Sequence, residues 1–247
     1  MDSIPTIAEV SGIFLLAGFV KGVIGLGLPT VAIGLLGLMM APAQAAAILV
    51  VPSLVTNVWQ SVAGPRLLVL VRRLWLMLAG ICLGTWASAG IITGSNSAVA
   101  SGALGIALVL YGTLGLSRVH VAIPARAEIW LAPLVGLTTG VVTGATGIFT
   151  LPAVVYLQAI GLDKDELVQA LGLSFTVSTA ALGAALMDSG ALRVTEIGLP
   201  AVSLLAALIG IGLGQIVRTR VRPERFRLLF FIGLLLLGAH LALRAFL

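Results

Sequence analysis

Hydrophobic residues fall into long unbroken runs instead of alternating with polar ones. Eight such runs, almost free of charge, cover residues 7–40, 43–62, 74–93, 98–117, 128–159, 168–187, 197–217 and 228–246. Six of them contain about 20 residues, which is the length of one membrane-spanning helix. The runs 7–40 and 128–159 are too long for one span, because a straight helix of 34 or 32 residues would reach roughly 50 Å, well beyond a hydrocarbon core of about 30 Å.

Both long runs are interrupted near the middle by a glycine-rich segment that ends in proline. These segments run from Gly22 to Pro29 and from Gly144 to Pro152. Glycine loosens the helical backbone and proline removes a hydrogen-bond donor, so we expect each run to break there. A broken run crosses the membrane once with a kink, or turns back as a hairpin of two shorter helices.

The basic residues distinguish these two topologies. If both long runs are hairpins, eleven basic residues lie on one side and only Arg193 and Arg244 on the other, whereas single crossings divide them six against seven. The positive-inside rule therefore favours the hairpins, with both termini outside and the arginine-rich loops in the cytoplasm. The eleven are Arg66, Arg72, Arg73, Arg118, Arg126, Lys164, Arg218, Arg220, Arg222, Arg225 and Arg227.

Composition excludes the soluble classes of protein. The chain of 247 residues is 60% hydrophobic and 9% charged, too few charges to cover a water-soluble globule. Disorder is excluded too, because it needs low hydrophobicity and high charge. The net charge of +5 lies in short loops that orient the chain, so it does not indicate nucleic acid. The sequence therefore predicts an all-α polytopic membrane protein.

The two halves of the chain, 1–120 and 121–247, match each other. The pair Gly22 and Gly25 corresponds to Gly144 and Gly147, and Pro29 corresponds to Pro152. Ala43-Gln44-Ala45 likewise corresponds to Val168-Gln169-Ala170. Each half then contains one broken or re-entrant helical hairpin and three spans, and the odd number of crossings makes the repeats inverted. Inverted repeats with broken helices are typical of secondary transporters that bind substrate near the midplane. The alternative is a duplication without a transport role.

The segment from Gly18 to Pro29 and its counterpart from Gly140 to Pro152 resemble the TauE/SafE family, also called the sulfite exporter or toluene-sulfonate uptake permease family. The similarity runs from about residue 10 to residue 245. It implies a permease of the bacterial inner membrane, without a cofactor, for small sulfur-containing anions such as sulfite or organosulfonates. The family includes exporters and importers, so the direction stays open. The second repeat departs from the pattern, with Ile148-Phe149-Thr150 in place of glycines and Thr143 at the position of Lys21.

Lys21 is the only charged residue deep within a predicted span. A buried ammonium is costly in hydrocarbon and normally faces a cavity or a partner. Since no aspartate or glutamate lies within the core of a span, the expected partner is an anion that the protein does not supply. The alternative is that Lys21 reaches the membrane interface with its long side chain.

We expect the substrate to bind near the two breaks. The returning half-helices offer free N–H groups and a positive dipole end near Gly27 and Gly147, and glycine lets an oxyanion approach the backbone. The alternative for the glycines is that they only allow close helix packing. The alternative for each threonine and serine in the predicted set is that its hydroxyl donates to a carbonyl of its own helix. The predicted substrate-binding residues are Lys21, Gly22, Gly25, Gly27, Pro29, Asn57, Thr143, Gly144, Thr146, Gly147, Thr150, Ser174, Thr176 and Ser178.

Other functions fit the sequence less well. An intramembrane enzyme is not expected, because the spans contain no serine elbow, no pair of histidine and carboxylate and no cluster of cysteine and histidine. The two isolated histidines do not make a metal site, and no P-loop is present for ATP hydrolysis. An anion channel and a membrane subunit of a larger complex stay open as alternatives. Coupling to Na⁺, coupling to H⁺ and simple uniport stay open too.

Overall fold

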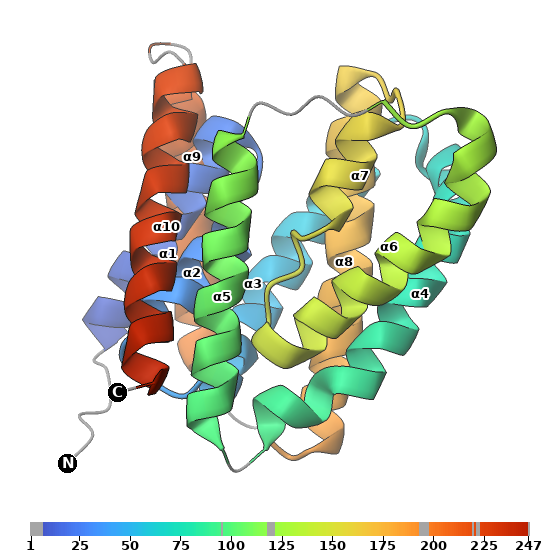
Figure 1. Cartoon of the computed structure of the whole chain (residues 1–247). Helices are drawn as coiled ribbons and strands as arrows, with labels where there is room; N and C mark the ends of the chain where they lie inside the picture. The colour runs from blue at the N-terminus through green and yellow to red at the C-terminus, as the bar shows by residue number, and fades with distance from the viewer. Residues whose placement is uncertain are drawn as a thin grey trace.

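The computed structural model describes residues 7–94, 96–117, 122–192, 198–218, 220 and 223–246. Within these residues the regular structure is entirely helical (Figure 1). Eight helices are long and apolar enough to cross a membrane, and the helices α2 and α7 are short. This confirms the all-α polytopic class. The helices are α1 (Ile7–Ile24), α2 (Leu28–Leu36), α3 (Pro42–Val62), α4 (Leu67–Thr93), α5 (Ser97–Leu116), α6 (Ala125–Thr146), α7 (Ala153–Ala159), α8 (Lys164–Asp188), α9 (Gly198–Arg218) and α10 (Pro223–Phe246).

Both long apolar runs are interrupted at the predicted glycines. Gly25 and Gly27 lie between α1 and α2 with φ angles of +81° and +104°, in the left-handed region that glycine adopts without strain. Gly147 ends α6 in the same way, with a φ of +76°. The second interruption is longer than the first, since it extends from residue 147 to residue 152 before α7 begins.

One end of the bundle contains a large cavity, and we call it the vestibule end. Its lining includes Gly37 after α2, Ser97 at the start of α5, Leu192 after α8, Gly198 at the start of α9 and Arg244 in the last turn of α10. These helix ends therefore lie close together in space. The lower part of Figure 1 shows this end of the molecule.

The opposite end joins a different set of helix ends, and we call it the basic end. Arg66 before α4 pairs with Glu166 in α8 at 3.1 Å, and the N–H of Ile123 donates to the carbonyl of Ala159 at the end of α7. Most of the described basic residues lie at this end or in the helix turns next to it. Of the basic residues in the topology prediction, Arg118, Arg193 and Arg222 lie outside the described residues.

The glycine contacts show the direction of the helices that pack together. In α1, Gly18 contacts Ala207 and Gly22 contacts Ile211, so α1 and α9 run in the same direction. The helices α4 and α6 are also parallel, whereas the pairs α3 with α8 and α5 with α10 are antiparallel. Thus α1 leaves the vestibule end and α2 returns to it, while α6 leaves the basic end and α7 returns (Figure 1).

The helix contacts form a set of matched pairs. α1 packs on α9 as α6 packs on α4, and α3 packs on α9 as α8 packs on α4. Exchanging the five helices of one half for those of the other therefore reproduces the main contacts. Two buried apolar clusters hold the fold, one centred on α1, α2, α5 and α10 and one on α4, α6, α7 and α8. The predicted boundary between the halves, residues 120 and 121, lies outside the described residues.

Candidate functional site

Lys21 is buried beside the first break, with 7% of its surface exposed. Its Nζ donates to Oδ1 of Asn57 and, at 3.2 Å, to Oγ1 of Thr56, both on α3. The side chain thus points to the interior of the bundle and does not extend to the interface. Thr56 in turn donates to the carbonyl of Pro52 at 2.9 Å, which orients its hydroxyl oxygen.

No carboxylate compensates the charge of Lys21 in the part of the chain that the structure describes. The two ion pairs recorded there join Arg66 with Glu166 and Arg73 with Glu128, both at the basic end. An ammonium that is buried among neutral partners is costly, because hydrogen bonds replace only part of its hydration. A small anion beside Lys21 would remove much of that cost.

Further donors near the middle of α3 and α8 are buried and have no hydrogen-bond partner among the described residues. They are Nδ2 of Asn57 and the hydroxyls of Ser53, Ser174 and Ser178. The antiparallel contacts set Gly172 against Ser61 and Gly183 against Val50, so both serines of α8 lie at the height of Ser53 and Asn57. We call these four residues and Lys21 the donor group because they lie at similar depths; Lys21 contacts Asn57 of this group, whereas Ser174 and Ser178 lie on another side of α8 from Gly172 and Gly183, which face α3.

The donor group combines one ammonium with neutral polar groups that can donate hydrogen bonds. Each of its five members supplies N–H or O–H groups, and none is an acid. Leaving a buried polar group unpaired costs about 1–3 kcal/mol, so a bound water or a ligand that accepts hydrogen bonds would stabilise these four groups. A sulfite or sulfonate group has this character, because its three oxygens are all acceptors.

The predicted threonines do not all belong to this group. Thr143, Thr146 and Thr176 each donate to a carbonyl four residues earlier in their own helix, at 2.7–2.8 Å. Thr146 also accepts from the N–H of Ile148 and so shapes the second break. The hydroxyl of Thr150, in contrast, is buried and does not bond to its own helix; it lies beside the buried hydroxyl of Tyr111.

The predicted glycines lie in two kinds of surroundings. Gly22 packs on the backbone of α9 and Gly144 on the backbone of α4, where a side chain would overlap with the neighbouring helix. Gly25 has no atom within 4 Å of the place that a Cβ would occupy. A Cβ at Gly27 would lie 3.1 Å from the ring of Phe230, and a Cβ at Gly147 would overlap with Ile33 of α2.

The helix that follows each break begins differently. α2 begins directly after Gly27, which is its N-cap, and no side chain caps it. Pro29 and Thr30 lie in its first turn, and the buried hydroxyl of Thr30 has no partner among the described residues. In the second half α7 begins only at Ala153, so its first N–H groups do not adjoin Gly147.

The predicted residues therefore lie at two depths. A Cβ at Gly147 would lie 3.6 Å from that of Ala46, in the first turns of α3. Asn57 follows Ala46 by eleven residues, or about 16 Å along the helix. The structure thus brings Lys21, Thr56 and Asn57 together in the half of α3 that is nearer the basic end and places the second break near the vestibule end.

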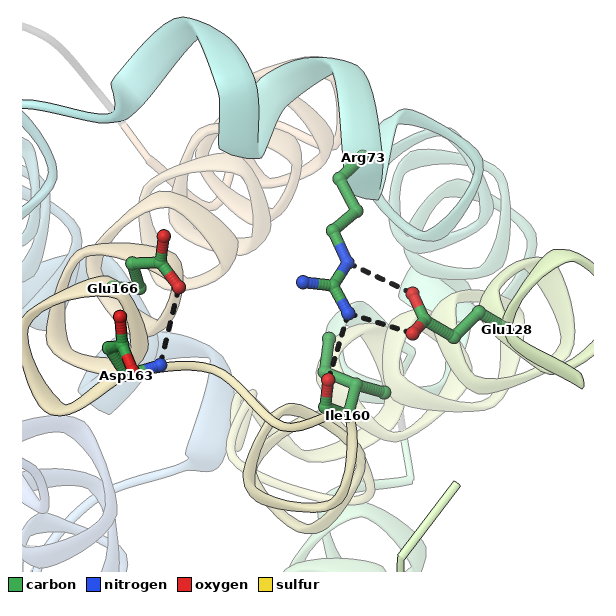
Figure 2. A network of polar contacts seen from close by, with 5 residues as sticks. All are labelled: Arg73, Glu128, Ile160, Asp163 and Glu166. Atoms are coloured by element: carbon green, nitrogen blue, oxygen red, sulfur yellow. Dashed lines mark hydrogen bonds and ion pairs between the residues drawn. The ribbon is translucent and has the colours of Figure 1, made fainter. Parts of the chain in front are cut away.

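Polar contacts join the helix ends at the basic end, and the sequence did not predict them. Figure 2 shows Arg73 of α4 donating from Nε and Nη2 to Glu128 of α6, at 3.0 and 2.7 Å, and from Nη2 to the carbonyl of Ile160 at 2.8 Å. It also shows the N–H of Asp163 donating to Glu166 at the start of α8, at 3.2 Å. One arginine thus ties the start of α6 and the end of α7 to α4.

The vestibule at the other end has a volume of about 940 Å³. Arg244 lines it and donates from Nη1 to the carbonyl of Leu38 at 3.1 Å. The vestibule reaches Ile48 on α3, which precedes Asn57 by nine residues, or about 14 Å of helix. Buried residues of α3, among them Leu49 and Ser53, separate the lining of the vestibule from Asn57.

The comparison with protein families agrees with this picture. A family model described as "Sulfite exporter TauE/SafE" matches residues 10–241, nearly the whole chain. The search of curated proteins and the search of solved structures gave no match. The match confirms the resemblance of the glycine-rich segments, and the eight long apolar helices agree with a family of membrane permeases. The chain belongs to the TauE/SafE family.

Proposed function

We propose that this protein is a secondary transporter that carries a small sulfur-containing anion, sulfite or an organosulfonate, across the bacterial inner membrane. The observation that carries this proposal is the donor group, in which one buried lysine has only neutral partners. The family match supports the class of substrate.

The charge of the site favours an anion with one negative charge. Lys21 supplies one positive charge, and Asn57, Ser174 and Ser178 supply neutral donors. Hydrogen bonds from neutral groups are roughly half as strong as those from charged ones, so the site would hold a sulfonate without trapping it. A transporter needs this balance, because it must release its substrate on the other side.

The arrangement of the helices supports two inverted repeats, residues 1–120 and 121–247. α1 and α6 start from opposite ends of the bundle, and the main helix contacts are reproduced when the halves are exchanged. In this proposal the substrate crosses between the halves, along the face where α3 packs on α8. The basic end faces the cytoplasm by the positive-inside rule, and the vestibule end faces outward together with both termini.

The predicted site residues then take two roles. We propose that Lys21, Asn57, Ser174 and Ser178 contact the anion, and that Gly25, Gly27, Pro29 and Thr150 border its path. The closely packed or self-bonded residues hold the surrounding helices in place. These are Gly22, Thr143, Gly144, Thr146, Gly147 and Thr176.

The test is a binding experiment with purified protein in detergent. Sulfite, thiosulfate, sulfoacetate, taurine, an aromatic sulfonate and sulfate are titrated into the wild type and into Lys21→Gln. Because a hydrogen bond from a charged group contributes about 1.5–3 kcal/mol, we expect the variant to bind roughly 10- to 100-fold more weakly. Lys164→Gln, which removes an exposed charge at the start of α8, is the matched control and should bind as the wild type does.

Two results would contradict the proposal. In the first, Lys21→Gln binds the preferred anion as tightly as the wild type. In the second, its folded yield falls in proportion to its binding, which would make Lys21 a structural residue. If none of the sulfur anions binds to the wild type, the proposed class of substrate is wrong.

A further inference from the structure

Two glutamines occupy the same place in the two repeats but lie in different surroundings. Gln44 lies in the first turn of α3 and Gln169 in the second turn of α8, each between two small or apolar residues. Gln169 is 1% exposed, whereas Gln44 is exposed and lines the vestibule. The repeats therefore differ in conformation at this pair of residues.

Gln169 closes the basic end through its amide group. Nε2 donates to the carbonyls of Ser61 and Gly64, both at 2.7 Å, and Oε1 accepts from the N–H of Arg66 at 3.1 Å. These three bonds tie the start of α8 to the end of α3 and to the turn that follows it. We call this set of contacts the Gln169 clamp.

The parts of an equivalent clamp are present at the vestibule end. The repeat offset of 125 residues that relates Gln44 to Gln169 also relates Ser61 to Leu186 and Gly64 to Ser189. Leu186 and Ser189 lie at the end of α8 and in the turn that follows it. The carbonyl of Leu186 now accepts from the N–H of Leu192 at 2.9 Å.

The two ends of the molecule differ because the contact of Gln44 that would correspond to the Gln169 clamp is not formed. Within the part of the chain that the structure describes, the Gln44 side chain forms no hydrogen bond. Gln44, Ala191 and Leu192 instead line the same cavity. The vestibule thus lies between Gln44 and the turn that follows Ser189, while Leu186 and Ser189 themselves lie outside its lining.

We propose that Gln44 closes the vestibule end by making to Leu186 and Ser189 the backbone contacts that Gln169 makes to Ser61 and Gly64, and that transport exchanges one clamp for the other. This inference rests on the proposed transport function. In the structure the Gln169 clamp is formed and the vestibule is open. In the opposite state the Gln44 clamp is formed and the basic end is open.

A glutamine suits this exchange. Its amide donates and accepts without a charge, so each clamp forms and breaks without moving an ion out of water. Two clamps built from the same groups have similar free energies. The two states are then close in energy, as an alternating mechanism requires.

The test measures which end of the molecule is accessible, and it needs no substrate. In a Cys82→Ser background, Ser101→Cys reports on the vestibule, and Ser61→Cys reports on the buried surface at the basic end. The rates of labelling with a soluble maleimide are measured in detergent for each reporter. Their ratio follows the balance between the two states.

The two glutamines should shift this ratio in opposite directions. Gln169→Ala removes the clamp at the basic end, so labelling of Ser61→Cys rises relative to Ser101→Cys by about tenfold. Gln44→Ala removes the opposing clamp, so labelling of Ser61→Cys falls. The double variant returns toward the ratio of the parent. Gln158→Ala, at an exposed glutamine of α7, is the control and leaves the ratio unchanged.

The proposal is overturned if Gln44→Ala behaves as the control does, or if both variants shift the ratio in the same direction. A general loss of stability would produce the latter result, because it increases labelling of both reporters. Opposite shifts in a protein that transports no sulfur anion would support the clamps and reject the proposed substrate. Transport of a sulfur anion without these shifts would support the proposed substrate and reject the clamps.

Discussion

Gly80 offers a quantitative test of the helix packing that holds the second hairpin. It lies on α4 against α6, and a Cβ there would be 2.7 Å from the carbonyl oxygen of Pro133 and 2.8 Å from the N of Leu137. Ordinary van der Waals contact begins at 3.4 Å. Gly80→Ala therefore requires the two helix backbones to separate by about 0.6–0.7 Å at this point.

Gly90 in the same helix supplies the control. No atom lies within 4 Å of a Cβ built at Gly90. Both substitutions improve helix propensity by about the same amount, roughly 1 kcal/mol. The difference between Gly80→Ala and Gly90→Ala thus isolates the cost of overpacking, which is typically about 1–3 kcal/mol.

Thermal unfolding in detergent measures this difference. For a chain of this size 1 kcal/mol corresponds to about 2–4 °C in the unfolding midpoint. We therefore expect Gly80→Ala to unfold about 2–12 °C below Gly90→Ala. Equal midpoints for the two variants would show that α4 and α6 do not pack as closely as the structure has them.

Two other predictions concern the topology and the breaks. In intact cells that carry Cys82→Ser, a membrane-impermeant maleimide should label Ser97→Cys at the vestibule end and spare Ala63→Cys at the basic end; the reverse pattern would refute the orientation. Gly147→Ala and Gly25→Ala both place a side chain at a positive φ, which costs about 1–2 kcal/mol. Gly147→Ala should have the lower unfolding midpoint in detergent, because its methyl group also overlaps with Ile33, whereas Gly25 has open space beside it. Equal midpoints would contradict this packing at the second break.

The sequence predicted the helical class and the places where the long runs break, because both depend on local properties. Gly25, Gly27 and Gly147 adopt positive φ angles, as a chain that turns inside the membrane requires. Pairs of glycines four positions apart also allow two helices to approach closely, and the structure shows such close backbone contacts at Gly80, Gly84, Gly136, Gly140, Gly210 and Gly214.

The composition of the site depends on tertiary contacts that no local pattern contains. The sequence indicated that Lys21 needs a partner, but its contact with Thr56 and Asn57 depends on the tertiary packing that brings the end of its side chain to α3. Similarly, Thr176 and Ser178 are equivalent in the sequence pattern. In the structure the hydroxyl of Thr176 donates to a carbonyl of its own helix, whereas the hydroxyl of Ser178 is buried without a partner among the described residues.

The basic end shows a second limit of the sequence analysis. The repeat placed Gln44 and Gln169 in register, which was the signal that this position matters. It did not show that the two side chains differ in conformation, because a sequence repeat describes both halves alike. In the proposed exchange of clamps, their difference reflects the state of the molecule.

The most direct test of the central claim is the exchange of radiolabelled sulfite by the purified protein in liposomes preloaded with unlabelled sulfite. The account predicts that uptake saturates with concentration and is faster when sulfite is present inside the liposomes. An external organosulfonate should inhibit uptake by competition, and the Lys21→Gln variant should show no such uptake. Uptake that rises linearly with concentration, does not depend on internal sulfite and is the same in Lys21→Gln would contradict it. That result would describe a channel, with no binding site at Lys21.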